Sequence, residues 1–198
     1  MADIFQIKIL IEGYSFSSED GNNRATGTST LITGPVNVVV DTGGPWDTEV
    51  LLRALNLSDL RPDQIDYLVC THGHSDHVGN LNLFRSAKHI VGFDINHKDV
   101  YFEHDFQSGA AYDLYKDVLQ VMPTPGHMHS DVSVVARHVK GLGTVVVCGD
   151  LFESENDEEV WKELSEWPEE QAKQRKKVLE IADYIIPGHG PMFKVKKN

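Results

Sequence analysis

Residues 71 to 77 read Thr-His-Gly-His-Ser-Asp-His, and this heptapeptide follows an apolar run that predicts a buried strand. It places three imidazoles and one carboxylate within six residues. Zinc and related divalent metals prefer such ligands, and zinc needs at least three of them converging on one point. A helix would scatter this spacing, because neighbours on a helix surface lie three and four residues apart. The heptapeptide therefore predicts a loop that turns four side chains toward a metal: His72, His74, Asp76 and His77.

Three further candidate ligands share one local setting. His127 lies in Thr-Pro-Gly-His, Asp150 in Val-Cys-Gly-Asp and His189 in Ile-Pro-Gly-His, each after an extended apolar run. Glycine before a ligand lets the backbone approach a site closely or adopt a positive φ. One such residue alone would more often be structural, but the repeated setting favours a common site. The seven candidates are too many for one tetrahedral zinc and are typical of two metals that share a bridging carboxylate.

These motifs, together with Val-Val-Val-Asp-Thr-Gly at residues 38–43, resemble those of the metallo-β-lactamase superfamily. The resemblance runs from Val38 to Gly190, which is most of the chain. It implies that His72, His74 and His127 hold a first metal, and that Asp76, His77 and His189 hold a second. It also implies that Asp150 bridges the two ions. Asp41 would then fix the orientation of a ligand from behind it.

The resemblance implies an α/β fold, an αββα four-layer sandwich of two mixed sheets covered by helices, in one domain over residues 1–198. Apolar alternation and short apolar runs predict strands that agree with this fold. The predicted strands are Phe5–Ile11, part of Gly27–Ile32, Asn37–Val40, Tyr67–Thr71, His89–Phe93, Leu119–Met122, Val132–Ala136, Thr144–Cys148 and Tyr184–Ile186. The predicted helices are Asp47–Leu57, Asp76–Phe84, Asp157–Glu166 and Glu169–Ala182. The aromatic-rich segment 94–119 is expected to be irregular, as a substrate lid, a dimer contact or a satellite of the core.

Composition limits the partners and the compartment. No apolar run approaches the ~20 residues of a membrane span, and residues 1–10 lack a signal-peptide pattern, so no membrane association is expected. The two cysteines suggest no disulfide framework and favour a reducing compartment. Both precede a candidate ligand by two residues and are expected to be small core residues. The formal net charge of −12 argues against broad nucleic-acid affinity, because nucleic-acid binders usually present a basic surface.

The resemblance extends into the helix and strand sequences of a superfamily member that is regarded as a di-zinc endoribonuclease acting on histone pre-mRNA. It implies two Zn²⁺ per chain, RNA as substrate and a location in cytoplasm and nucleus, and a homodimer is the expectation at family level. A water held between two cations loses its proton near neutral pH and becomes a nucleophile. Asp76 would orient this metal-bridging hydroxide, and His129 would donate a proton to the leaving group.

Two other classes of function remain open. The first is an acyl or thioester hydrolase of the glyoxalase II type, which small size and acidity favour. The second is a metal-binding protein without turnover. A mononuclear iron enzyme would use only His72, His127 and Asp150, and would leave the other candidates unexplained. Nitrogen and oxygen ligands also accept iron or manganese, so the sequence does not fix the metal.

Overall fold

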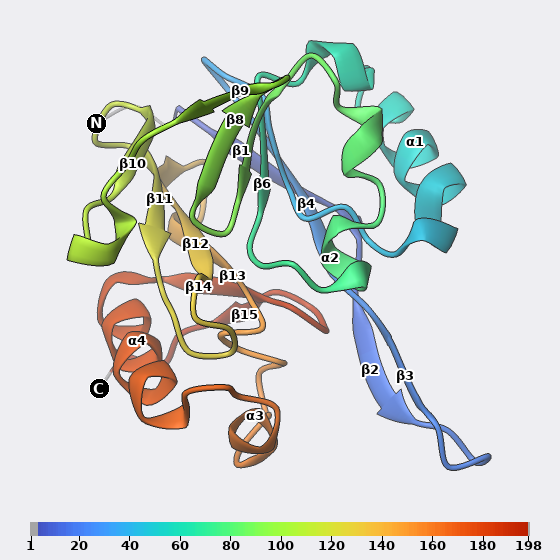
Figure 1. Cartoon of the computed structure of the whole chain (residues 1–198), viewed down its shortest axis with the longest axis vertical. Helices are drawn as coiled ribbons and strands as arrows, with labels where there is room; N and C mark the ends of the chain where they lie inside the picture. Colours follow the sequence, from blue (N-terminus) through green and yellow to red (C-terminus); the bar gives the residue numbers. More distant parts are fainter. Residues whose placement is uncertain (1–3, 198) are drawn as a thin grey trace.

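Two β-sheets pack face to face, and helices cover their outer surfaces, in a computed structural model that describes residues 4–197 (Figure 1). One sheet holds, in spatial order, β1 (Gln6–Ile11), β4 (Ser29–Thr33), β5 (Val38–Val40), β6 (Tyr67–Cys70), β7 (Lys88–Val91), β8 (Asp94–His97) and β9 (Val100–Phe102). The other holds β10 (Tyr112–Tyr115), β11 (Leu119–Pro123), β12 (Val132–Val139), β13 (Gly143–Gly149), β14 (Tyr184–Pro187) and β15 (Phe193–Lys194). Both are mixed, because β5, β6 and β7 run parallel to one another, as do β13 and β14.

Helix α1 (Thr48–Asn56) covers the first sheet and α4 (Pro168–Ile181) covers the second, which completes the αββα order and confirms the predicted fold class. Both helices begin and end within one residue of their predicted bounds. Two one-turn helices, α2 (Ser75–Val78) and α3 (Val160–Glu163), lie in connecting loops. Within residues 4–197, no helix combines the length and the apolar character that crossing a membrane requires.

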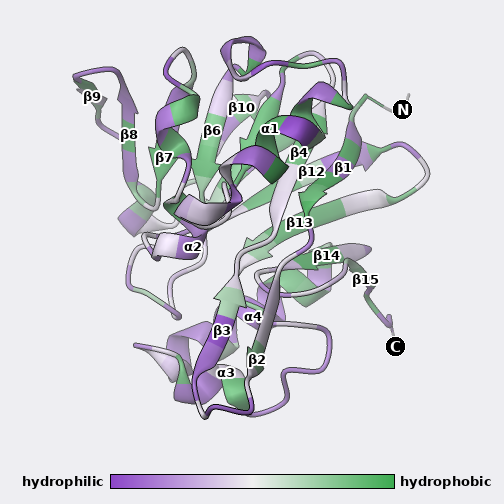
Figure 2. Cartoon of the chain, turned by 90° about the vertical axis from the view of Figure 1, so that its right-hand side faces the viewer, coloured by the Kyte–Doolittle hydropathy of each residue, from purple (hydrophilic) through white to green (hydrophobic). Residues whose placement is uncertain are grey.

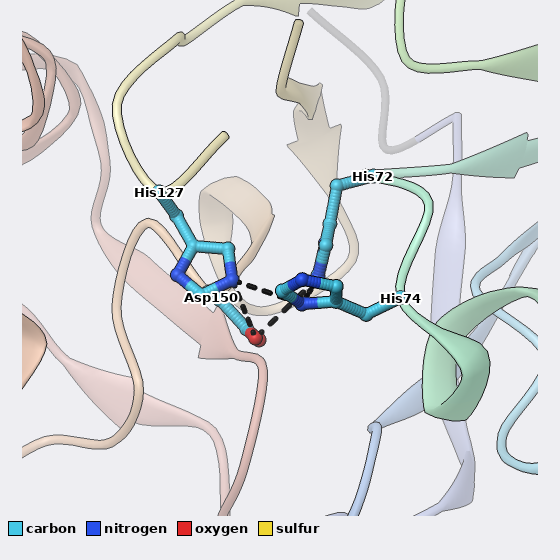
Figure 3. Close-up of side chains that lie close together, drawn as sticks. All are labelled: His72, His74, His127 and Asp150. Carbon is cyan, nitrogen blue, oxygen red and sulfur yellow. Dashed lines mark hydrogen bonds and ion pairs between the residues drawn. The ribbon is translucent and has the colours of Figure 1, made fainter. Parts of the chain in front are cut away.

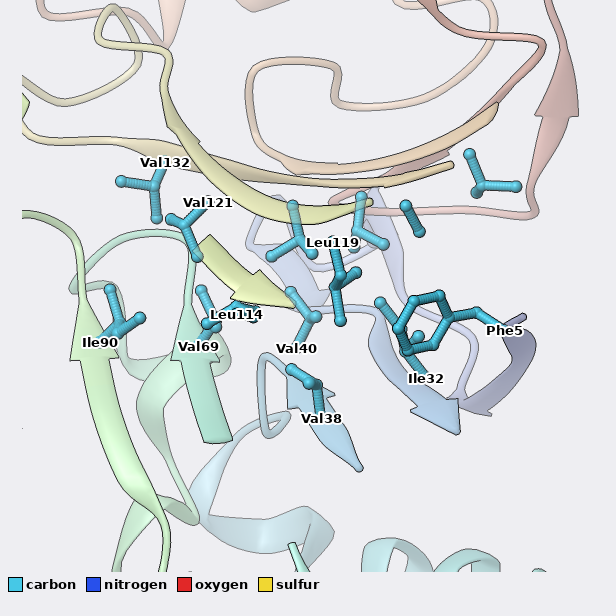
Figure 4. Close-up of a cluster of buried hydrophobic side chains, with 14 of the residues drawn as sticks. Phe5, Ile32, Val38, Val40, Val69, Ile90, Leu114, Leu119, Val121 and Val132 are labelled. Atoms are coloured by element: carbon cyan, nitrogen blue, oxygen red, sulfur yellow. The ribbon is translucent and has the colours of Figure 1, made fainter. Parts of the chain in front are cut away.

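The alternation of side chains along each strand fills three apolar layers, one between the sheets, one under α1 and one under α4. Successive side chains of a strand point to opposite faces of the sheet. In β5, Val38 and Val40 therefore face the second sheet, while Val39 packs toward α1. In β13, Val147 faces the first sheet and Val146 packs toward α4. The cluster between the sheets contains residues from both, as Figure 4 shows.

A β-hairpin that the sequence did not predict projects from the sandwich (Figure 1), and Figure 2 shows its two strands side by side. It pairs β2 (Tyr14–Ser17) with β3 (Asn23–Thr26) in a separate two-stranded sheet. Tyr14 and Phe16 are exposed on it, and their rings lie 5.5 Å apart. The hairpin was missed because the alternation of β2 covers only four residues and β3 carries none.

Two predicted helices are shorter than expected. The helix expected over Asp76–Phe84 ends at Val78, and a separate 3₁₀ turn covers Leu81–Leu83. The Asn80 side chain donates hydrogen bonds to the carbonyl oxygens of Thr42 and Gly44, and these bonds pull the chain out of helical geometry.

The helix expected over Asp157–Glu166 is reduced to Val160–Glu163. Asp157 does not start a helix, because its carboxylate binds the Arg175 guanidinium of α4 through two contacts of 2.7 Å. Ser165 instead donates a hydrogen bond to the Gly126 carbonyl oxygen, at 2.7 Å. Tertiary contacts thus replace the local hydrogen bonds that a longer helix would need.

The segment 94–119 is also more regular than expected, since it forms β8, β9 and β10. Phe106 and Leu114 join the cluster between the sheets, so this part of the segment belongs to the core. Tyr101 and Phe102 remain exposed. Both cysteines are buried among apolar side chains, Cys70 under α1 and Cys148 under α4, which confirms their interpretation as core residues. Burial raises the pKa of both thiols.

Candidate metal centre

The seven candidate ligands lie in loops that follow β6, β11, β13 and β14. Loops from both sheets therefore meet at one place, and the Val132 amide joins them by donating to the Thr71 carbonyl oxygen at 2.9 Å. The ligand atoms form two adjoining groups that could each hold a metal ion. A third group, made of Asp150, Glu153 and His189, shares Asp150 with the first group and His189 with the second.

The first group consists of His72, His74, His127 and Asp150, shown in Figure 3. His74 Nδ1 lies 3.0 Å from His72 Nε2 and 3.1 Å from His127 Nε2. Asp150 Oδ2 lies 3.5 Å from His72 Nε2 and 3.4 Å from His127 Nε2. A tetrahedral zinc with bonds of 2.0–2.1 Å separates its ligand atoms by roughly 3.3 Å. The four donors therefore surround a space of the size that a zinc ion fills.

The second group consists of Asp76, His77 and His189, with the other oxygen of Asp150 beside them. Asp150 Oδ1 lies 3.2 Å from His77 Nε2 and 3.4 Å from His189 Nε2. Asp76 Oδ2 lies 3.8 Å from each of the same two nitrogens. His77 Nε2 and Asp150 Oδ1 are buried, and neither has a hydrogen-bond partner within the described residues. Buried polar atoms of this kind require a bound cation or another partner.

The protonation states differ between the two groups. Burial holds the pKa of His72 and of His127 below its ordinary value, so both imidazoles are neutral and offer lone pairs at pH 7. Burial acts the same way on His77 and His189, but nearby carboxylates outweigh it. Asp150 and Asp41 together raise the pKa of His77 well above its usual value, and Asp150 chiefly raises the pKa of His189 to about 9. A metal in the second group must therefore displace protons, since ligating imidazoles bind metals in their neutral form.

Asp150 has a lowered pKa within the centre. Burial alone would raise its pKa, but His77 and His72 outweigh burial and hold the pKa well below its usual value. Asp150 is therefore a carboxylate at neutral pH. The glycine at 188 is needed beside it, because a side chain there would collide with Asp150 Oδ1.

Asp41, for which the resemblance implied an orienting role, lies behind His77 and, through Thr71, behind His72. It accepts hydrogen bonds from the Thr71 amide at 2.7 Å, the Thr71 hydroxyl at 2.9 Å and His77 Nδ1 at 2.9 Å. Because the Thr71 hydroxyl donates to Asp41, it accepts from His72 Nδ1 at 3.1 Å. The hydrogen bonds of His77 Nδ1 and His72 Nδ1 direct the Nε2 atom of each ring toward the ligand groups, which is how outer carboxylates orient metal ligands.

Helix α4 holds the loops of the second sheet. Gln171 Nε2 donates to the Asp150 carbonyl oxygen at 2.9 Å. Just before the helix, the Trp167 amide donates to the Gly126 carbonyl oxygen at 2.8 Å. Arg175 donates to the Leu151 carbonyl oxygen at 2.8 Å and pairs with Asp157. One buried helix face thus positions both His127 and Asp150.

His129, predicted as a proton donor, belongs to neither ligand group. Its side chain is 71% exposed, and its Nδ1 lies 2.7 Å from Glu166 Oε2. Its ring stacks on Trp167 with centroids 6.0 Å apart. Its part in proton transfer stays a prediction.

Glu153 is the buried residue that sequence reasoning missed. It reads as the first member of an acidic run, yet its side chain is only 8% exposed and lies beside His127 and His189. Burial and the charge of Asp150 raise the pKa of the Glu153 carboxyl to about 8. Its position three residues after Asp150 was the only signal available in the sequence.

The metal-free protein should lose stability as the pH rises from about 7 to 9. The folded-state pKa of His189 is about 9 against 6.5 for a free imidazole, and burial raises the pKa of Glu153 and of Asp131 to about 8. The folded chain therefore retains protons in this window that the unfolded chain has released, so raising the pH favours unfolding. His72 and His127 add nothing there, because they are neutral in both states.

Urea unfolding in the presence of a chelator at pH 7, 8 and 9 measures this dependence. We expect a midpoint that falls with pH in the metal-free protein and a smaller fall with zinc, because zinc replaces the proton on His189. A midpoint that is constant or rises with pH in the metal-free protein would contradict the raised folded-state pKa values of His189, Glu153 and Asp131.

Comparison with known proteins agrees with the fold. Residues 23–189 match the family model of the metallo-beta-lactamase superfamily, and the chain therefore belongs to this superfamily. The protein is a metallo-hydrolase in the broad sense that this superfamily defines. Its two ligand groups supply His and Asp residues that could bind metal.

Within the superfamily, the chain is similar to metallo-beta-lactamase domain-containing protein 1 of Xenopus laevis, at 47% identity over 97% of this chain and 82% of that protein. The human protein of the same name is 39% identical over 99% and 84%. Hydroxyacylglutathione hydrolase of Aeromonas hydrophila is more distant, at 29% identity over 59% of this chain and 46% of that protein. A crystal structure of a Thermotoga maritima protein assigned to the metallo-beta-lactamases superposes with a TM-score of 0.72 at 19% identity, covering 96% of this chain and 99% of that one.

Proposed function

We propose that this protein is a di-zinc hydrolase. His72, His74 and His127 would hold one ion, Asp76, His77 and His189 would hold the other, and Asp150 would bind both. The orientation of Asp150 carries the proposal, because Oδ2 faces the first group while Oδ1 faces the second. A carboxylate so placed would bind one ion through each oxygen if both sites were filled. Imidazole and carboxylate donors suit zinc, and iron and manganese are the alternative ions.

The reaction that we infer is hydrolysis of a phosphodiester bond in RNA, with the 3′-end region of histone pre-mRNA as the favoured substrate. The resemblance of the chain to an endoribonuclease of the superfamily supports this choice. When bound, two divalent ions lower the pKa of water and stabilise charge on the attacking and leaving oxygens of an in-line displacement.

Two side chains of the protein have inferred roles in this step. The Asp76 side chain is 17% exposed, against 5% for Asp150, so its carboxylate reaches the solvent side and can orient the attacking water. His129 would transfer a proton to the leaving group. Its Nδ1 is bound to Glu166, and its Nε2 is then the atom that carries the transferred proton.

The charge distribution indicates that the substrate is held chiefly at the metal centre. The net charge is −12, and basic residues outside the centre are partly neutralised. Lys173 pairs with Glu170, and Lys197 pairs with Asp183. We therefore expect weak binding of RNA of arbitrary sequence, because such binding depends on basic side chains that contact phosphates.

Hydrolysis of a small acyl or thioester substrate is the second candidate function. The similarity to a hydroxyacylglutathione hydrolase favours it. The same centre would serve, since two metals polarise a carbonyl oxygen as well as a phosphoryl oxygen.

The first proposal is tested by incubating the zinc-loaded protein with end-labelled single-stranded RNA and with histone 3′-end RNA. The His72→Ala variant, with its metal content measured, is assayed in parallel as the control. We expect cleavage by the wild type and none by the variant. Cleavage of thioesters without cleavage of RNA would favour the second candidate. Turnover of neither substrate at full metal loading would leave a metal-binding protein without turnover.

A further inference from the structure

The Glu153 side chain is held against the metal centre by its own backbone contacts. Its amide donates to Asp157 Oδ2 at 3.0 Å, and its carbonyl oxygen accepts from the His189 amide at 2.8 Å. Asp157 is in turn fixed by Arg175. The loop after β13 therefore presents the Glu153 carboxylate to the centre and not to the solvent.

One oxygen of Glu153 faces an unpaired nitrogen of the first group. Oε1 lies 3.8 Å from His127 Nδ1, and within residues 4–197 neither atom has a hydrogen-bond partner although both are buried. The other nitrogen of His127 is turned toward His74 and Asp150, so Nδ1 is the one that carries the ring proton. A shift of less than 1 Å would bring the two atoms to the usual 2.7–3.2 Å of a hydrogen bond. A ligating histidine almost always donates its second N–H in this way.

The other oxygen of Glu153 faces the ligand atom of the second group. Oε2 lies 3.9 Å from His189 Nε2. His189 Nδ1 donates to the Thr26 carbonyl oxygen at 3.0 Å, so Nε2 is the atom that is free to bind a metal. Glu153, Asp150 and His189 place one ligand atom each within 4.8 Å of one another. Acceptor atoms that converge in this way require a positive charge between them. In the metal-free protein this charge is a proton, and in the metal-bound protein it is the metal ion.

We propose that Glu153 is an eighth member of the metal centre. Oε1 accepts the Nδ1–H of His127, and Oε2 is an additional ligand of the ion held by Asp76, His77 and His189. The second site then has three carboxylates, whereas the first has Asp150 alone. The inference rests on the proposed metal pair and not on the choice of RNA as substrate.

Glu153→Gln tests this role, because the amide has nearly the same shape but lacks the charge. Glu155→Gln is the matched control, since Glu155 lies in the same loop and is exposed. Zinc affinity is measured by competition with a chelator, and zinc content by elemental analysis after dialysis. We expect the weaker of two zinc-binding steps to lose about 10–100-fold in affinity in Glu153→Gln, and Glu155→Gln to match the wild type.

Unfolding of the metal-free variants separates a metal role from a purely structural one. A metal role predicts that metal-free Glu153→Gln is as stable as the wild type or more stable, because a buried carboxyl group has been replaced by a neutral amide. If Glu153→Gln does not fold, Glu153→Asp keeps the charge on a side chain one methylene shorter, and we expect an intermediate loss of zinc affinity.

Equal zinc affinity in Glu153→Gln and Glu155→Gln would overturn the inference. So would a loss of metal-free stability in Glu153→Gln with both zinc-binding steps unchanged. Neither readout uses RNA, so absence of RNA cleavage by the wild type would count against the proposed substrate and leave the zinc measurements to decide on Glu153.

Discussion

Asp150→Ala should lower kcat/KM for the hydrolysed substrate by more than about 10³-fold and reduce zinc content below two ions per chain. Loss of a single transition-state donor costs an enzyme about 10²–10³-fold. Asp150 faces both ligand groups, with its two oxygens 3.2 to 3.5 Å from four histidine nitrogens. Its removal would therefore affect both proposed ions at once, and the expected loss exceeds that of one donor.

Asp150→Asn refines this experiment, because the amide retains the shape of the carboxylate but carries an NH₂ group on one side. Such a group cannot bind a metal, so we expect one of the two zinc-binding steps to survive better than the other. Asp99→Asn is the control, since Asp99 lies in an exposed turn between β8 and β9. If Asp150→Ala, with a verified low zinc content, turned over substrate as fast as the wild type, the proposed centre would be contradicted.

Asp41→Ala should lower the free energy of unfolding by about 3–5 kcal/mol, the range found when one partner of a buried charged pair is removed. The carboxylate is 1% exposed and accepts hydrogen bonds from Thr71 and His77. Its loss leaves the Thr71 amide and His77 Nδ1 buried without partners. His77 and His72 also lose their fixed orientation, so we expect weaker zinc binding at both sites.

The backbone conformation of Asp41 requires a particular control. Its φ of 57° lies in the left-handed region, which alanine tolerates less well than aspartate does. Asp59 has a φ of 55° and an exposed side chain, so Asp59→Ala measures the cost of the backbone alone. Urea unfolding of both variants, with and without zinc, gives the difference. Equal destabilisation by the two substitutions would mean that the Asp41 hydrogen bonds contribute nothing measurable.

Local patterns predicted most of the strands and the candidate ligands that the structure brings together, whereas their division between two ions came from the resemblance to the superfamily and stays a prediction. The apolar run before His72 and the Val-Val-Val run before Asp41 are buried strands whose alternation fixes which side chains face the second sheet. The heptapeptide then places His72, His74, Asp76 and His77 within six residues, so their side chains lie close together in the folded chain. Both signals depend on neighbours in the sequence, and sequence patterns report such neighbours well.

What the sequence did not predict depends on contacts between distant segments. Glu153 looked like part of a solvated acidic run, and its burial results from Arg175, which holds Asp157 and so closes the loop. The same ion pair shortened the helix expected at Asp157. The β2–β3 hairpin is held at its base by backbone bonds such as Gly27 to Asp76, at 3.1 Å, which no local pattern reveals. In each case tertiary contacts decided the outcome over local propensity.

Because loops from both sheets contribute ligands, the site can form only late in the synthesis of the chain. Residues 72–77 leave the ribosome well before Asp150 and His189, so no nascent chain that lacks the second sheet can complete either ion site. Under the proposed two-metal centre, zinc binding would therefore follow the docking of the sheets. Metal binding and sheet docking stabilise the same folded state. We therefore expect the two sheets to separate more often when zinc is scarce, and the chain to be cleaved faster by cellular proteases.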